Sequence, residues 1–80
     1  MKYTDISAAK AAHKGKVIVW HQLSLGGQNK DRWMWTAEKN GEVIDYHTKD
    51  ILVGNAIHLG EKVVVLKLHR DRTVSSTQIN

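Results

Sequence analysis

Histidine is the residue type of this chain best suited to metal binding or proton transfer. The five histidines are His13, His21, His47, His58 and His69. Structural zinc sites use closely spaced ligands and commonly include cysteine. No pair here has a His-x3-His spacing, and the chain has no cysteine. We therefore expect scattered histidines, with no metal or other cofactor.

Two further sets of residues have the chemistry of catalytic groups. Glu38 and Asp45 are diagonal neighbours in a predicted hairpin, and paired carboxylates can exchange protons. Ser24, His47 and Asp45 have the residue types of a nucleophilic triad, but Ser24 lacks the glycine spacing of a nucleophile elbow. A hairpin of a small domain offers little concavity, and active sites are usually clefts. We do not expect an enzyme.

Basic residues form two clusters in the sequence. The clusters are Lys10, His13, Lys14 and Lys16, and then Lys67, His69, Arg70 and Arg72. The formal net charge is +4, which favours anionic partners. If the clusters meet in space, they form one patch that binds nucleic-acid phosphates through Lys10, Lys14, Lys16, Lys67, Arg70 and Arg72. Trp20 or Trp33 would stack on bases if exposed. Ordinary solubilising charges are the alternative.

The sequence Asn40-Gly41 between alternating apolar residues predicts a hairpin over residues 32–47, because both central residues of a type I′ turn need positive φ. The predicted register pairs Lys39 with Glu42, Ala37 with Ile44, Trp35 with Tyr46 and Trp33 with Thr48. The apolar face then faces the core. In the alternative, Trp33 and Tyr46 form an exposed stacking platform.

The other elements are read from periodicity. Residues 4–14 predict a short helix with Thr4 as N-cap. The apolar patterns of residues 16–25 and 61–70 predict strands. The first is apolar on both faces, which indicates a central or barrel-like strand. Residues 48–60 are ambiguous, with a strand slightly favoured over a helix because several of them are poor helix formers.

Together these elements predict an α+β fold with one short N-terminal helix. The sheet is expected to be antiparallel, with four or five strands curled into an SH3-like or half-barrel shape. Residues 1–72 would form one small domain and residues 73–80 a flexible polar tail. The predicted core is Ile6, Ala9, Val17, Val19, Leu23, Trp33, Trp35, Ile44, Tyr46, Val64, Leu66 and Leu68.

The absence of cysteine and of a long apolar run predicts a cytoplasmic protein without a membrane segment. We expect a small non-enzymatic module, monomeric or homodimeric, that binds nucleic acid. The alternative is a small regulatory or inhibitory protein, of the kind that phages and mobile elements encode, that docks on a larger protein. The defining motifs of the common nucleic-acid-binding families are absent.

Overall fold

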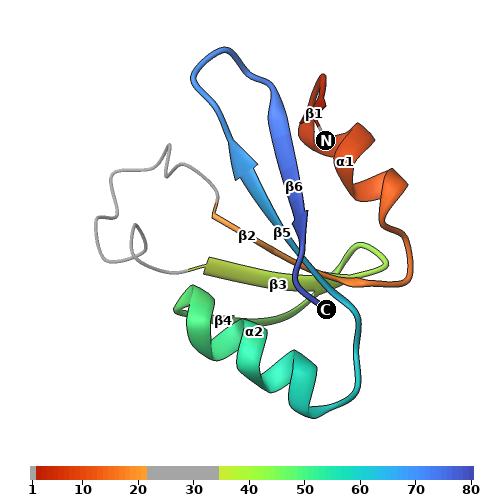
Figure 1. Cartoon of the computed structure of the whole chain (residues 1–80), viewed down its shortest axis with the longest axis vertical. Coiled ribbons are helices and arrows are strands. Elements are labelled where there is room, and N and C mark those ends of the chain that lie inside the picture. Colours follow the sequence, from red (N-terminus) through yellow and green to blue (C-terminus); the bar gives the residue numbers. More distant parts are fainter. Residues whose placement is uncertain (1, 22–34) are drawn as a thin grey trace.

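The computed structural model describes residues 2–21 and 35–80, which form one sheet with two helices (Figure 1). The strands are β1 (Lys2–Tyr3), β2 (Val17–Trp20), β3 (Trp35–Lys39), β4 (Glu42–His47), β5 (Val63–Leu68) and β6 (Val74–Gln78). The helices are α1 (Ile6–Ala12) and α2 (Lys49–His58). The α+β prediction is therefore confirmed.

The sheet has six strands in the order β1-β6-β5-β2-β3-β4. All neighbouring pairs are antiparallel except β2 and β5, which are parallel. The predicted purely antiparallel sheet of four or five strands was wrong. So was the barrel-like closure, because β1 and β4 form two separate edges of an open sheet in the described part of the chain.

Strand β2 lies in the middle of this sheet, as its two apolar faces predicted. All four of its residues are buried. Ile18 and Trp20 pack with Ala9 of α1, whereas Val17 and Val19 pack with Leu52 and Ala56 of α2. Since successive side chains point to opposite faces of a strand, the two helices cover opposite faces of the sheet. We call these the α1 face and the α2 face.

Helix α1 is shorter than the predicted 4–14, and its N-cap lies one residue later than predicted. Asp5, and not Thr4, is the N-cap, and its carboxylate accepts a hydrogen bond of 2.8 Å from the N–H of Ala8. The carboxylate satisfies a backbone donor that would otherwise lack a partner at the helix start. Ala9, with no exposed surface, brings the helix close to the sheet.

The ambiguous segment 48–60 contains α2, so the slight preference for a strand was wrong. Thr48 occupies the N-cap position, as the helical alternative required. Leu52 and Ala56 lie four positions apart and are buried against β2 and β3. This burial outweighs the poor helix propensity of Val53, Gly54 and Asn55.

The predicted hairpin is present, but its register is correct only beside the turn. Asn40 and Gly41 have φ values of 53° and 84°, and Lys39 pairs with Glu42. A β-bulge then shifts the pairing, so that Trp35 lies opposite His47 and Thr36 opposite Tyr46. The predicted Trp35–Tyr46 pair is therefore wrong.

The bulge also removes two residues from the predicted core. Ile44 is 56% exposed and Tyr46 is 57% exposed. The predicted core residues that are buried are Ala9, Val17, Val19, Val64 and Leu66. Ile6, Trp35 and Leu68 are half-buried at its margin. Leu23 and Trp33 lie outside the described residues.

The predicted flexible tail 73–80 was wrong, because it contains β6. Val74 is 1% exposed in the α1-face core, and β6 pairs with both β5 and β1. At the end of the chain, the Asn80 side chain accepts a hydrogen bond from the N–H of Val63 and donates one to the carbonyl of Glu61, both 2.8 Å long.

Candidate functional site: a basic groove on the sheet

The two predicted basic clusters do not form one patch. Lys16 lies where β2 begins, and its Nζ donates to Oε1 of Gln78 over 2.9 Å. Lys67, Arg70 and Arg72 lie at the opposite end of the β5–β6 hairpin, because β2 and β5 run parallel and Lys67 is near the end of β5. The sheet topology therefore separates the clusters along the strands.

The predicted contacts on the α1 side are engaged in internal interactions. Lys10 forms an ion pair of 3.0 Å with Glu38, and its ammonium lies 4.1 Å from the centroid of the Trp20 ring. Trp20 is only 8% exposed. Stacking by Trp20 was expected only for an exposed ring, and this ring is buried. Lys14 is exposed beyond the end of α1. Trp33 lies outside the described residues.

Two of the predicted residues, Lys67 and Arg70, line a groove on the α2 face. Among residues 2–21 and 35–80, helix α2 covers only part of this face, and the groove lies beside it on β5 and β6 (Figure 1). The groove has a volume of about 1000 Å³. Val65 of β5 lines the groove with Thr77 and Ile79, in and after β6. Trp35 of β3 and Lys49 and Val53 of α2 also line it.

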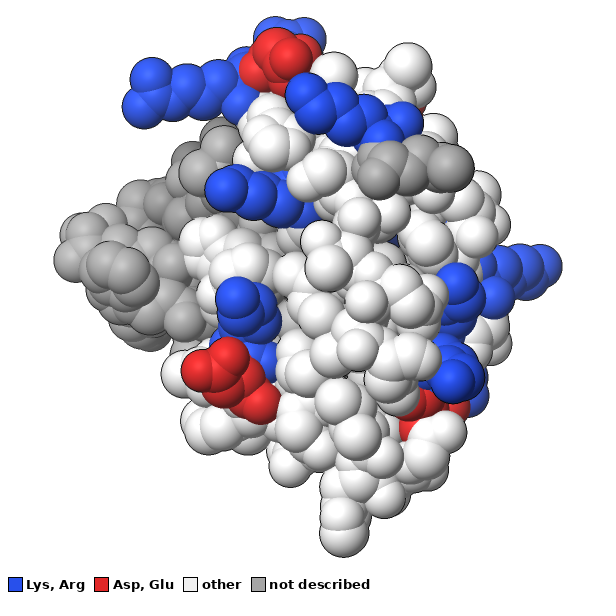
Figure 2. Space-filling view, in the orientation of Figure 1, with Lys and Arg blue, Asp and Glu red and all other residues white. Residues whose placement is uncertain are grey.

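Among the described residues that line the groove, basic groups outnumber acidic ones. These residues include Lys49, Lys67 and Arg70 and one carboxylate, that of Asp50. The three basic residues take no part in the two ion pairs found between described residues, which are Lys10–Glu38 and Lys39–Glu61. Figure 2 shows Lys and Arg side chains around a largely uncharged central surface on this side of the molecule.

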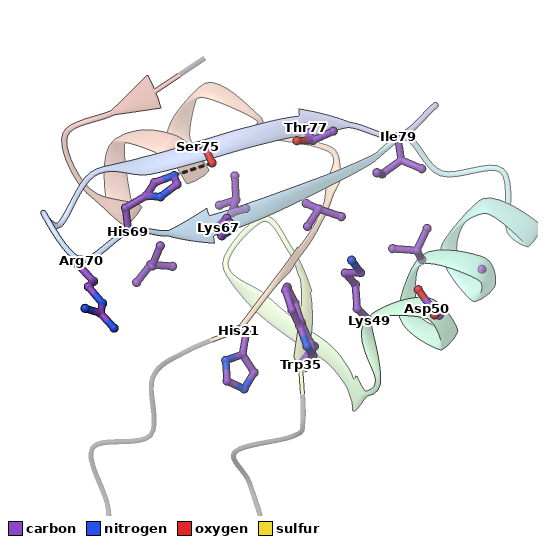
Figure 3. Close-up of a pocket in the computed structure, with 15 residues that line it drawn as sticks. His21, Trp35, Lys49, Asp50, Lys67, His69, Arg70, Ser75, Thr77 and Ile79 are labelled. Atoms are coloured by element: carbon purple, nitrogen blue, oxygen red, sulfur yellow. Dashed lines mark hydrogen bonds between the residues drawn. The ribbon is translucent and has the colours of Figure 1, made fainter.

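Trp35 is the tryptophan among the described residues that line this groove. It lies between His21 and Lys49 in the close-up of Figure 3 and is half-buried. The His21 ring is tilted, with its centroid 5.3 Å from that of Trp35. The Lys49 ammonium lies 5.7 Å from the same ring. The indole is thus held between a histidine and a cation at the wall of the groove.

The remaining groups near Arg70 are fixed by local hydrogen bonds. His69 Nε2 and Ser75 Oγ are 3.0 Å apart across the β5–β6 hairpin (Figure 3). In the turn, Asp71 accepts from the N–H and the hydroxyl of Thr73, and these bonds lower the pKa of the Asp71 carboxyl. Arg72 follows with a φ of 72° and is exposed.

The sequence analysis missed Trp35 and Lys49 as groove residues. Trp35 was assigned to the core, and the residue lies at the core margin, where half of a side chain can pack and the other half can contact a ligand. Nothing in the sequence identified Lys49 as a groove residue, because its position depends on the docking of α2. The exposed Tyr46 of the predicted platform is on the α1 face and does not join Trp35.

The catalytic and metal alternatives gain no support from the geometry. Glu38 is on the α1 face and Asp45 lies opposite Ala37 on the α2 face, so the two carboxylates do not share a face. Within residues 2–21 and 35–80, no group of three or more His, Asp or Glu side chains is placed to hold a metal ion. Ser24 lies outside the described residues.

Neither helix of the described chain is long and apolar enough to cross a membrane. Comparisons of the sequence and the structure with protein-family models, curated proteins and solved structures give no match.

Proposed function

We propose that the protein is a non-enzymatic nucleic-acid-binding module and that the groove on the α2 face is its binding surface. The observation that supports this most is the combination, in one open groove, of three basic side chains with a half-buried tryptophan. Proteins that bind nucleic acid through a groove combine positive charge along the backbone path with aromatic side chains for the bases.

Each groove residue has a part in this proposal. Lys67 and Arg70 contact phosphates at one end, and Lys49 contacts a phosphate on the α2 side. Val65 and Ile79 provide apolar surface between them. Arg72, one turn beyond the groove, extends the basic surface. The lack of cysteine fits action in a reducing compartment such as the cytoplasm.

A charge-reversal experiment tests this assignment. The variant Lys67→Glu/Arg70→Glu should bind a mixed-sequence oligonucleotide at least tenfold more weakly. The slope of log K against log salt concentration should become shallower by about two, because each phosphate contact contributes about 0.9. Fluorescence anisotropy with a labelled oligonucleotide, measured across a salt series, gives both quantities.

Lys14→Glu/Lys62→Glu is the matched control, because it changes the net charge by the same amount at two exposed lysines that do not line the groove. It should change the affinity by less than about threefold. Equal losses in both variants would contradict the groove and indicate attraction by net charge alone. No binding by the wild-type protein at low salt would contradict the proposed function.

A second candidate function is docking on a larger protein, and a separate feature favours it. Ile44 at the bulge and Leu59 after α2 are exposed by 56% and 77%. They flank a cleft of about 420 Å³ between β4 and α2, with Val17, Ala37 and Leu52 at its base. Exposed apolar surface around a cleft is typical of protein-binding sites.

The two candidates are separated by one comparison at high salt, where phosphate contacts are weak. If the protein docks on a partner, wild type and Lys67→Glu/Arg70→Glu should retain the same protein from a lysate, and Leu59→Glu should lose it. If only Lys67→Glu/Arg70→Glu fails to retain the partner protein, docking through the cleft is contradicted.

A further inference from the structure

We propose that the ligand of the groove is single-stranded nucleic acid, with one base stacked on the indole ring of Trp35. This inference rests on the proposed function and deepens it, because charge alone does not distinguish one strand from two. The distinction comes from where the groove places its tryptophan.

Trp35 is recessed at the wall of the groove and does not project from the surface. Its neighbours on the α2 face are buried or half-buried apolar residues, Ala37 and Val53. A base reaches such a ring only by entering the groove with its flat face uncovered. In a duplex, both faces of each base are covered by stacking on the next pair. A single strand exposes them, and aromatic stacking is the usual source of affinity in proteins that bind single strands.

The neighbours of the ring fit this geometry. Lys49 is exposed and lies 5.7 Å from the ring centroid, at the long end of a cation–π contact. Its flexible stem allows the ammonium to leave the ring and bind the phosphate of the base that replaces it. His21, directly after β2, is itself in contact with the ring and supports its orientation.

The groove also provides space and charge beside the ring. Its volume of about 1000 Å³ is at the upper end of the usual range for ligand pockets, roughly 300–1000 Å³. Lys67 and Arg70 lie toward the other end of the β5–β6 surface (Figure 3), so a strand with a base on Trp35 can place neighbouring phosphates near them.

The decisive test is a thermodynamic cycle between Trp35 and the base. Wild type and Trp35→Leu are each titrated with labelled oligothymidylate and with an abasic strand of the same length, which has the same phosphates. We expect wild type to bind the abasic strand roughly 5- to 150-fold more weakly, the range given by stacking on one aromatic side chain. Trp35→Leu should bind the two strands within about twofold of each other.

Tyr46→Leu is the matched control, because Tyr46 is an exposed aromatic residue on the other face of the sheet. It should keep the wild-type preference for the strand with bases. A duplex of the same length should bind wild type and Trp35→Leu equally. Circular dichroism checks that Trp35→Leu is folded, and the wild-type comparison of the two strands stands without any variant.

The outcomes separate this inference from the function on which it rests. If wild type binds oligothymidylate and the abasic strand equally, the stacking inference is wrong and the charged groove stands. If folded Trp35→Leu keeps the preference, Trp35 is not the stacking residue. If wild type binds neither strand at low salt, the proposed function itself is wrong.

Discussion

Trp20 donates its indole N–H to Oε2 of Glu38 over 2.9 Å, and the same oxygen accepts from the Lys10 ammonium over 3.0 Å. Glu38 is 5% exposed, and the Lys10 ammonium also lies over the Trp20 ring. The carboxylate therefore links α1, β2 and β3. At this place neither the Lys10 ammonium nor the Trp20 ring is fully exposed to solvent. This interaction gives Lys10 and Trp20, both predicted binding residues, a part in holding the fold together.

Replacing Glu38 should destabilise the fold by an amount that depends on the acceptor left behind. Glu38→Ala leaves the buried indole N–H without its partner and Lys10 without its ion pair, so we expect a loss of about 3 kcal/mol in the free energy of unfolding. Glu38→Gln keeps an amide acceptor and should lose about 1 kcal/mol. Urea denaturation measures both values. Equal effects of the two variants would show that the acceptor has no part in the stabilisation.

The stability of the protein should fall at mildly acidic pH because of His13. Burial, followed by the nearby charge of Lys16, lowers the pKa of His13 from its ordinary value of 6.5. The Lys16 ammonium donates to Nδ1 over 3.2 Å, which requires a neutral ring. The unfolded chain thus binds the proton more readily than the folded protein. The stabilisation is complete above pH 6.5 and is lost as the pH falls through the lower pKa of the folded state.

The measurement is the melting temperature of wild type and of His13→Gln between pH 7.5 and pH 5. The difference between the two proteins should change with pH, because the glutamine variant keeps the other histidines but not this titration. Parallel curves would contradict the role of His13.

Asp45 should protect the exposed edge of the sheet. Its carboxylate accepts a hydrogen bond of 2.8 Å from the N–H of Tyr46, in an edge strand whose six residues are all exposed. Free backbone groups on an edge strand are sites for pairing with another chain. We expect Asp45→Ala to associate at concentrations where wild type does not, as measured by sedimentation velocity. Asp45→Asn keeps an acceptor and should sediment like wild type. Identical behaviour of Asp45→Ala and wild type would refute this role.

Val74 should be as important to stability as a residue in the middle of the chain. It is 1% exposed, so Val74→Ala should lower the free energy of unfolding by about 2 kcal/mol. Thr77→Ala, at an exposed position of the same strand, should change it by less than about 0.5 kcal/mol. Guanidinium denaturation of both variants checks this. If Val74→Ala is as stable as wild type, β6 does not contribute to stability and residues 73–80 behave as a flexible tail.

Local sequence signals predicted the local features of the fold. The turn at Asn40-Gly41 depends on two φ angles, and both are encoded by residue type. The central place of β2 followed from apolar residues on both of its faces. The β2–β5 pairing had no comparable signal, because a parallel pair joins segments far apart in the sequence. The bulge in β4 also left no trace in the alternation of residues, although it moved Tyr46 away from Trp35.

For the binding residues too, local sequence signals were predictable and contacts between distant segments were not. Lys67 and Arg70 were identified because exposed basic residues at the end of a strand are visible in the sequence. Their meeting with Trp35 and Lys49 was not, because it depends on α2 docking across the sheet from β5 and β6. Strand β6 was missed because its polar residues resemble a tail, while Val74 is its one fully buried side chain.

The position of β1 beside β6 affects how the chain folds during synthesis on the ribosome. β1 pairs with residues 74 and 75, and Ala9 of α1 shares its core with Val74. The N-terminal segment therefore gains these partners only after residues 74 and 75 have been synthesised. Contacts between distant segments slow folding. We expect nascent chains that end before β6 to stay sensitive to protease, and protection to appear in a single step once residues 74–78 have left the exit tunnel.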